Sequence, residues 1–300
     1  MRILKLILLF IIVSITWGTT WIAMKIIVET IPPLFATGMR FLLISPLLLI
    51  ISYLNEVPLL FPLGKKKLQM LITIFYFFIP FTLMLYAGTY INSILSSMMF
   101  SIMPIVILIA SWFFLKEKIF LIQILGITLA IVSLITLLII KCDFNNYYEL
   151  KGIFSIILAI LSHAFIYIQC KIKCCNISVF TFNTLPSLVS GIILLILSLI
   201  IEHPSYQTFS IKSMLALFYL SNFSGLFGIL SFFYLQKKVK SFISSIVFLI
   251  FPLISITLEK YIYKYNISKN EILIIIFLII GTLLTLAPKI FVFKNLKVKK

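Results

Sequence analysis

The chain of 300 residues is 62% hydrophobic and only 11% charged, with a mean hydropathy of +1.22. Soluble domains carry about 25% charged residues, so this chain lacks the polar surface that a water-soluble globule needs, and lipid must cover much of its outside. The formal net charge of +17 does not indicate nucleic-acid binding, because the Lys residues lie in short breaks between apolar segments, where membrane proteins keep their cytoplasmic anchors.

The first apolar run, residues 6–24, follows Arg2 and Lys5 and so resembles a signal peptide. It has no small-x-small cleavage site and is longer than a usual h-region, so it is interpreted as the first retained helix. Residues 33–53 form the second apolar run, which only Arg40 interrupts.

Residues 68–115 contain no charge at all. At about 1.5 Å per residue, this stretch is far too long for one crossing of a core about 30 Å thick. It must fold back, and the polar, small segment 88–93 is the natural turn. The remaining uncharged runs bring the prediction to ten transmembrane helices; they are 119–140, 152–170, 174–201, 213–236, 241–258 and 272–288.

The distribution of Lys and Arg predicts the orientation of these helices. With the N-terminus in the cytoplasm, the inner segments hold 17 Lys and Arg residues and the outer segments hold seven. Glu56 and Glu117 lie inside, and the other six acidic residues lie outside. The bias favours a multi-pass protein of the cell (inner) membrane with both termini cytoplasmic. Every loop is short, which excludes a large extramembrane enzyme or receptor domain.

An internal repeat divides the chain. A shift of 148 residues overlays the fourth span on the ninth, and the matched serines and proline lie on one helical face. Five spans per half is an odd number, so equivalent helices cross in opposite directions. The fold predicted is an all-α membrane protein of two inverted five-helix repeats, with repeats at 1–140 and 152–290 and a basic cytoplasmic tail at 291–300. Inverted repeats are a structural route to alternating access.

The opening of the chain resembles a known family. Trp17-Gly18-Thr19-Thr20-Trp21, then Pro32-Pro33 and Gly38-Met39-Arg40-Phe41, are similar to the start of an EamA-type member of the drug/metabolite transporter superfamily. Pro104, Lys116-Glu117-Lys118 and Gly126 resemble the close of that family's first repeat. In the second half, His163-Ala164 stands near the usual Trp-Gly place. The resemblance implies a ten-helix inner-membrane carrier, commonly an exporter of amino acids, metabolites or toxic compounds.

Two titratable side chains lie within the predicted spans. Arg40 is about 10 Å below the outer boundary by helical rise, where it either anchors an anionic group such as a substrate carboxylate, or snorkels or bonds backbone carbonyls. His163 either relays protons or is a hydrogen-bonded packing residue. No Asp or Glu lies inside a predicted span, since Glu259 falls at a helix end, and this counts against a carboxylate-based pump.

Each of the other candidate residues has two possible interpretations. Pro104 and Pro252 are hinges or static kinks. The serines near them either line the path or permit close helix packing. Aromatic residues either bracket a substrate or are interfacial. Besides Arg40 and His163, the predicted substrate-binding residues are Trp17, Trp21, Tyr86, Ser97, Tyr234 and Ser245.

The four cysteines, three of them at C-x-x-x-C-C, lack the paired spacing and His partners of a zinc site, so no metal or cofactor is expected. The leading hypothesis is a non-enzymatic carrier that works by alternating access. Its central cavity is expected to be lined by the first, third, fourth, sixth, eighth and ninth helices. Its partners are a small-molecule substrate and the bilayer, and the chain is compatible with a homodimer. The rivals are a channel, a non-transporting membrane protein, a membrane-embedded enzyme and, within the superfamily, an uptake carrier or exchanger.

Overall fold

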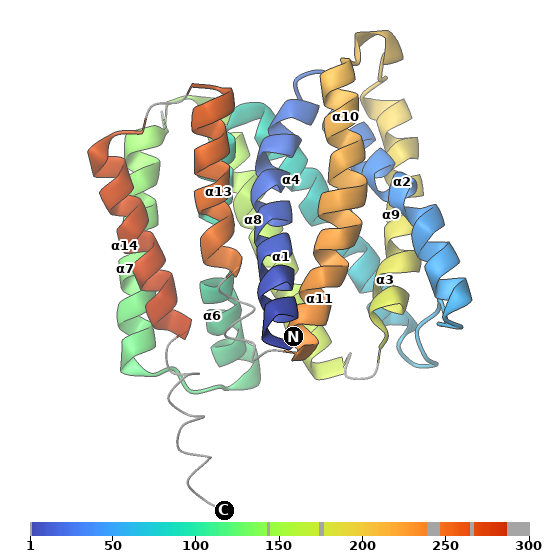
Figure 1. Cartoon of the computed structure of the whole chain (residues 1–300), viewed down its shortest axis with the longest axis horizontal. Helices are drawn as coiled ribbons and strands as arrows, with labels where there is room; N and C mark the ends of the chain where they lie inside the picture. Colours follow the sequence, from blue (N-terminus) through green and yellow to red (C-terminus); the bar gives the residue numbers. More distant parts are fainter. Residues whose placement is uncertain (1, 143–144, 174–176, 239–246, 265–266, 287–300) are drawn as a thin grey trace, which may run out of the picture.

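The computed structural model of the chain describes residues 2–142, 145–173, 177–238, 247–264 and 267–286. Every regular element in these ranges is a helix, and the helices stand side by side in one bundle (Figure 1). In chain order the helices are α1 (Arg2–Ile27), α2 (Pro33–Leu54), α3 (Lys66–Ile72), η1 (Thr73–Phe78), α4 (Ile79–Tyr90), α5 (Ser93–Phe100), α6 (Met103–Leu115), α7 (Leu121–Lys141), α8 (Tyr147–Lys173), α9 (Val179–Ile201), η2 (Tyr206–Thr208), α10 (Ile211–Tyr219), η3 (Leu220–Phe227), α11 (Gly228–Lys238), α13 (Val247–Ile262) and α14 (Lys269–Leu286).

Nine helical stretches of the described residues are long and apolar enough to cross a membrane. Three of them join consecutive elements: α3–η1–α4, α5–α6, and α10–η3–α11. The remaining long helix, α13, has 16 described residues and begins directly after residues 239–246, which lie outside the described ranges. The chain is therefore an all-α, multi-pass membrane protein.

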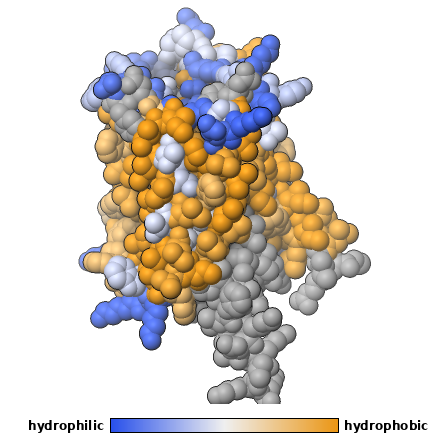
Figure 2. Space-filling view, turned by 90° about the vertical axis from the view of Figure 1, so that its left-hand side faces the viewer, coloured by the Kyte–Doolittle hydropathy of each residue, from blue (hydrophilic) through white to orange (hydrophobic). Residues whose placement is uncertain are grey.

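The surface of the bundle matches a lipid environment. Figure 2 shows a broad hydrophobic band over the side formed by α7, α13 and α14, with hydrophilic residues gathered at its upper and lower ends. The exposed apolar side chains of α7 and α14 include Ile135, Ile139, Leu273 and Ile276. Because leucine and isoleucine are as apolar as lipid tails, this face is stable only against hydrocarbon.

The two faces of the bundle are defined by the ends of the helices. α1 ends at the upper face of Figure 1, where α2 begins, and α14 ends at the lower face, where α1 begins. The uncharged stretch 68–115 folds back at this upper face, as predicted. α4 ends at Tyr90 and α5 starts at Ser93, and the side chain of Asn92 accepts a hydrogen bond of 2.8 Å from the Leu95 amide, which caps α5.

At each edge of the bundle, two helices pack against each other through glycine residues. Gly38 of α2 and Gly191 of α9 meet so closely that a Cβ at Gly38 would lie 2.9 Å from the Leu195 amide nitrogen. At the opposite edge (Figure 1), a Cβ at Gly126 of α7 would lie 2.7 Å from the carbonyl oxygen of Gly281 on α14. Small residues let membrane helices approach closely enough for backbone contact, and these pairs are the tightest of that kind.

Two spans contain a π-helical segment near their middle. They are η1, between α3 and α4, and η3, between α10 and α11. A π turn widens the helix and leaves backbone groups free for other partners. In η1 these are used by serines of neighbouring helices: Ser190 donates to the Thr73 carbonyl at 2.9 Å and Ser162 donates to the Phe75 carbonyl at 2.6 Å.

Candidate functional site

An aromatic series runs through the centre of the bundle. Consecutive ring centroids lie 4.5 to 6.2 Å apart along it. Edge-to-face and offset contacts at these distances are favourable for aromatic rings. In spatial order its members are Phe182, Tyr76, His163, Phe100, Trp21, Phe251, Phe248, Trp17 and Phe232.

Three of the predicted substrate-binding residues, Trp17, Trp21 and His163, belong to this series. Its rings come from α1, η1, α5, α8, α11 and α13, which are the six spans expected to line a cavity, and from α9. His163 is 7% exposed, and its Nδ1 lies 3.1 Å from the Ala159 carbonyl oxygen. The side chain is thus a buried ring packed among aromatics, and both the packing and the proton-relay roles of His163 stay predictions.

Arg40 lies beside the aromatic series. Its guanidinium carbon is 4.6 Å from the centroid of Phe81, and the Phe81 ring in turn lies 5.4 Å from His163. Cation–π contact stabilises a desolvated guanidinium. The side chain is only 4% exposed, which excludes the snorkelling alternative, and its Nη1 has no hydrogen-bond partner in the described part of the chain.

A narrow, apolar-walled pocket surrounds Arg40. It is formed where α2, η1, α9, η3 and α11 meet, so it shares only the third and eighth spans with the expected cavity. Two serines and one asparagine are its other polar groups, and the Asn183 Oδ1 atom also has no hydrogen-bond partner among the described residues. The pocket, called here the Arg40 pocket, is lined by Arg40, Phe41, Ile44, Leu48, Phe77, Asn183, Ser187, Ser221, Gly225 and Ile229.

Gly225 lies beside the arginine, but its tightest contact is with the backbone of its own span. A Cβ there would lie 4.0 Å from the Arg40 Nε and 3.0 Å from the Leu220 carbonyl oxygen. Gly225 lies in η3, so the π turn of the eighth span forms one wall of the pocket, and Phe77 of η1 forms another. Both π-helical segments therefore contact the same site.

The remaining predicted binding residues lie elsewhere. Tyr86 packs on Tyr90, with 3.2 Å between their hydroxyl oxygens, away from the aromatic series. Ser97 is fully buried and donates to the Ile94 carbonyl of its own helix at 2.8 Å. Tyr234 is 53% exposed. Ser245 lies outside the described residues.

The predicted helix breaks differ from each other. The fourth span is interrupted at Ser101–Ile102, and Pro104 is the second residue of the new helix, α6, a position where its missing N–H costs nothing. Pro252 lies inside α13. The break before Pro104 falls close to Phe100, so it bends the span beside the aromatic series.

Glu259 corrects one expectation from the sequence. It lies in the last turn of α13, which ends at Ile262, and so at a helix end as expected, but its side chain is only 3% exposed. Its carboxylate accepts a hydrogen bond from the Ser93 hydroxyl, and Ser255 contacts Ser93 from the same helix as Glu259. Lys25 donates to the Gly88 carbonyl at 2.9 Å nearby. A buried carboxylate is therefore present at the end of α13, so its absence from the predicted spans does not count against a carboxylate-based mechanism.

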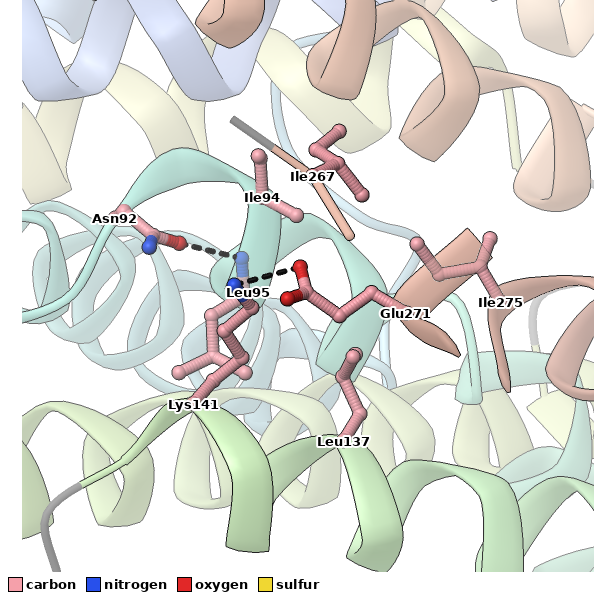
Figure 3. Close-up of a pocket in the computed structure, with 8 residues that line it drawn as sticks. All are labelled: Asn92, Ile94, Leu95, Leu137, Lys141, Ile267, Glu271 and Ile275. Atoms are coloured by element: carbon pink, nitrogen blue, oxygen red, sulfur yellow. Dashed lines mark hydrogen bonds and ion pairs between the residues drawn. The ribbon is translucent and has the colours of Figure 1, made fainter. Parts of the chain in front are cut away.

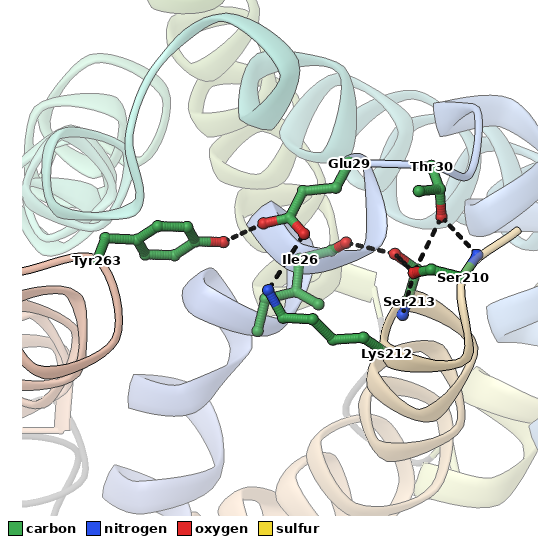
Figure 4. A network of polar contacts seen from close by, with 7 residues as sticks. All are labelled: Ile26, Glu29, Thr30, Ser210, Lys212, Ser213 and Tyr263. Atoms are coloured by element: carbon green, nitrogen blue, oxygen red, sulfur yellow. Dashed lines mark hydrogen bonds and ion pairs between the residues drawn. The ribbon is translucent and has the colours of Figure 1, made fainter.

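A polar network at the upper face joins the end of α1 to the second half of the chain (Figure 4). Glu29 accepts from the Tyr263 hydroxyl and pairs with Lys212 at 3.2 Å. Next to it, the Ser213 hydroxyl donates to the Ile26 carbonyl at 2.7 Å. Burial, and then the hydrogen bond to Glu29, raise the pKa of Tyr263, so its hydroxyl stays protonated and keeps donating. The network closes the upper face between α1, α10 and the α13–α14 connection.

A second pocket, between α5, α7 and α14, is held by an ion pair (Figure 3). Lys141 at the end of α7 meets Glu271 in the first turn of α14 at 2.6 Å. The pair lies at the peripheral edge of the bundle and away from the aromatic series, and it fixes α7 to α14 above their glycine contact. Its charge is compensated, unlike that of Arg40.

Asn183 and Glu259 are the functional candidates that sequence reasoning missed. Asn183 had a usable signal, because a side-chain amide inside an apolar span is costly in lipid and marks a buried contact. For Glu259, the only signal in the sequence was its position next to the end of a predicted span. Groups of three or more His, Cys, Asp or Glu residues able to hold a metal do not occur within the described ranges.

The fold and the site define a multi-pass helical membrane protein with an aromatic core and a buried cation next to it. The model of the EamA-like transporter family matches residues 4–139 and again 150–287, and the chain belongs to this family. An uncharacterized transporter of Buchnera aphidicola subsp. Schizaphis graminum is 58% identical over 291 residues, which is 97% of each chain.

Further relatives agree with this assignment. The protein PagO of Salmonella typhimurium is 50% identical over 289 residues, covering 96% of this chain and 95% of its own. A solved crystal structure superposes with a TM-score of 0.68 at 14% identity, covering 94% of this chain and 96% of that one. At this identity the structural match shows a shared fold alone. The family and the relatives establish a membrane transporter.

Proposed function

We propose that the chain is an inner-membrane secondary transporter that moves small metabolites, amino-acid-like or drug-like solutes, by alternating access, with export as its direction. Ten transmembrane helices would form two inverted five-helix repeats, 1–140 and 152–290. Both termini would be cytoplasmic, with 291–300 as a basic tail. The aromatic series would contact the apolar part of the solute.

The observation that carries this proposal is that the helix contacts recur when each span is replaced by its equivalent in the other half. If span n of the first half corresponds to span n+5, the contact of α1 with α13 corresponds to that of α8 with α5 and α6, and both occur. Likewise, the contact of α4 with α8 corresponds to that of α1 with α10 and α11. Equivalent helices also pair directly, α2 with α9 and α7 with α14.

The π-helical segments obey the same symmetry. η1 lies in the third span and η3 in the eighth, so each half carries one at the equivalent place. The two matches of the family model, 4–139 and 150–287, divide the chain in the same way. A transporter built from two related, oppositely oriented halves can reach two open states by exchanging their conformations.

The closed upper face favours alternating access over a channel. The network of Glu29, Lys212 and Tyr263 and the buried contact of Ser93 with Glu259 both bridge the two halves at this face. A carrier keeps such contacts on one side while the other opens, whereas a channel needs a continuous pore lined by polar groups.

Counterflow in proteoliposomes tests the proposal. Purified full-length protein is reconstituted in liposomes loaded with unlabelled amino acids, purines or quaternary ammonium dyes, and uptake of the labelled compound is followed. Saturable, temperature-sensitive counterflow with at least one compound is expected. Ion currents in planar bilayers without saturable flux would instead identify a channel, and the absence of both would leave a non-transporting membrane protein.

Direction is tested in cells. Cells that produce the protein are loaded with the compound found by counterflow and diluted into medium without it. Export predicts faster loss from these cells than from cells producing the Trp21→Ala variant, which lacks the central ring of the aromatic series. Net accumulation by producing cells would identify an uptake carrier.

A further inference from the structure

Arg40 is a buried positive charge without a counter-ion among the described residues. It is 4% exposed, and the ion pairs found among them do not include it. The ring of Phe81 compensates part of the charge, but Nη1 has no hydrogen-bond partner within the described part of the chain. An unpaired guanidinium at membrane depth is strongly unfavourable, and such charges face a partner or a cavity.

The Arg40 pocket supplies the cavity and a second unsatisfied group. Asn183 is 3% exposed, and its Nδ2 donates to the Val179 carbonyl at 2.7 Å. This bond identifies the other amide atom, Oδ1, as the acceptor that lacks a donor. One pocket of the structure thus holds an unused cationic donor and an unused neutral acceptor.

The two serines of the pocket add acceptors only. The Ser187 hydroxyl donates to the Thr184 carbonyl at 3.1 Å, and the Ser221 hydroxyl donates to the Leu217 carbonyl at 2.7 Å. Each hydroxyl proton is used within its own helix, so the oxygen lone pairs are what the pocket can offer. The site therefore suits an anionic group, which would contact the guanidinium. Next to the anion it also suits a hydrogen-bond donor, either on the same ligand or from a bound water.

The walls limit the size of that group. Phe41, Ile44 and Leu48 of α2, together with Phe77, are 6% exposed or less and close over the guanidinium. In a desolvated site of this kind, charge-assisted hydrogen bonds from arginine are strong and, with a planar carboxylate, often bidentate. A large multivalent anion does not fit between these side chains in the conformation described.

We propose that the Arg40 pocket binds one small monovalent anion, of the size of a carboxylate group, with Arg40 as its cation and Asn183 as acceptor for the adjacent donor or water. The anion has two chemical sources: the carboxylate of a transported solute, or a free ion such as a halide. Only the first source rests on the proposed function; the site itself does not.

Thermal unfolding of the purified full-length protein tests the site without any transport assay. Melting temperatures are measured in sodium formate, sodium bromide and sodium gluconate at equal ionic strength, since gluconate is too large for the pocket. Formate is expected to raise the melting temperature saturably above the gluconate value. The Arg40→Gln variant should lose this rise, and Lys260→Gln, which removes an exposed cation of α13, should keep it.

Asn183→Asp gives an independent test if Arg40→Gln fails to fold. The new carboxylate stands in the pocket where Arg40 lacks a partner, so it should replace the bound anion. This variant is expected to melt higher than the wild type in gluconate and to lose its response to formate. A variant that melts lower and still responds to formate would contradict the proposed arrangement.

The salts also separate the two sources. A rise with formate but not with bromide identifies a carboxylate site, whereas equal rises identify a site for any small monovalent anion. Equal melting temperatures in all three salts, or a formate effect that persists in Arg40→Gln, would overturn the proposal. Failure of counterflow with every compound would refute the transporter mechanism and leave this result unaffected.

Discussion

Glu29→Gln should open the upper face of the protein. The substitution keeps the shape of the side chain but removes the charge that Lys212 and Tyr263 both contact. The ion pair is 3.2 Å long with side chains 55% and 35% exposed, so it is worth about 0.5 kcal/mol. Glutamine still accepts from the Tyr263 hydroxyl, but a neutral amide oxygen is a weaker acceptor than a carboxylate, which adds a loss of about 1 kcal/mol. A loss of about 1.5 kcal/mol raises the population of the open state roughly tenfold.

A cysteine at position 23 reports this opening. Ala23 is 4% exposed and lies on α1, one turn below its end, so a thiol there is protected while the upper face is closed. In a background without the four native cysteines, labelling of Ala23→Cys by a membrane-impermeant maleimide measures the open population, provided that reclosing is faster than labelling. Glu29→Gln is expected to raise the labelling rate roughly tenfold.

Variants of the two partner residues measure how much each contact contributes to the labelling rate, and a third variant is the control. Lys212→Gln and Tyr263→Phe should each give part of the increase, and their combination should approach that of Glu29→Gln. Lys260→Gln should leave the rate unchanged. A rate in Glu29→Gln within twofold of the parent, with circular dichroism intact, would refute the assignment of the network as a closing contact.

Three stability predictions concern other contacts. Gly281→Ala should lower the free energy of unfolding in detergent by about 1–3 kcal/mol, because its Cβ would lie 2.5 Å from a backbone nitrogen of α7, whereas Gly88→Ala, with its nearest atom at 3.5 Å, should change it little. Glu202→Ala should cost about 1–2 kcal/mol, since this carboxylate accepts from two amides at the start of α2 at 2.8 and 2.9 Å; unchanged melting would contradict that role. Glu259→Leu should destabilise by about 1–3 kcal/mol and Glu259→Gln by less, because only leucine leaves the Ser93 hydroxyl without an acceptor; equal effects would refute the importance of that bond.

The fold was largely predictable from the sequence because the bilayer imposes a length on each apolar run. The turn between α4 and α5 followed from the size of the uncharged stretch, whereas the place of Arg40 within a span left open whether its side chain is buried or snorkels. Which helices pair did not follow, since Gly126 and Gly281 are separated by more than half the chain and their contact depends on packing alone.

The candidate site was only partly predictable, for a related reason. Hydropathy sets the length of a span but not the register of its backbone, so the π turns of η1 and η3 left no signal in the apolar pattern. The burial of Glu259 depends on Ser93, a residue of the other half, which covers it. Trp17, Trp21 and His163 were named because large aromatic and titratable side chains are conspicuous within an apolar span, and all three lie in the aromatic series. Tyr86 and Tyr234 were named for the same chemistry but lie outside it.

The glycine contacts at the two edges set the mechanical partition of the molecule. Each edge pair combines one helix of the first half with one of the second, at backbone distances that leave no room for sliding. Under the proposed alternating access, the two sequence repeats would therefore not move apart as rigid bodies, because that motion would separate the helices of both edge pairs. The edge pairs would then stay fixed, and the conformational change would be confined to the six spans between them, two of which contain the π-helical segments η1 and η3.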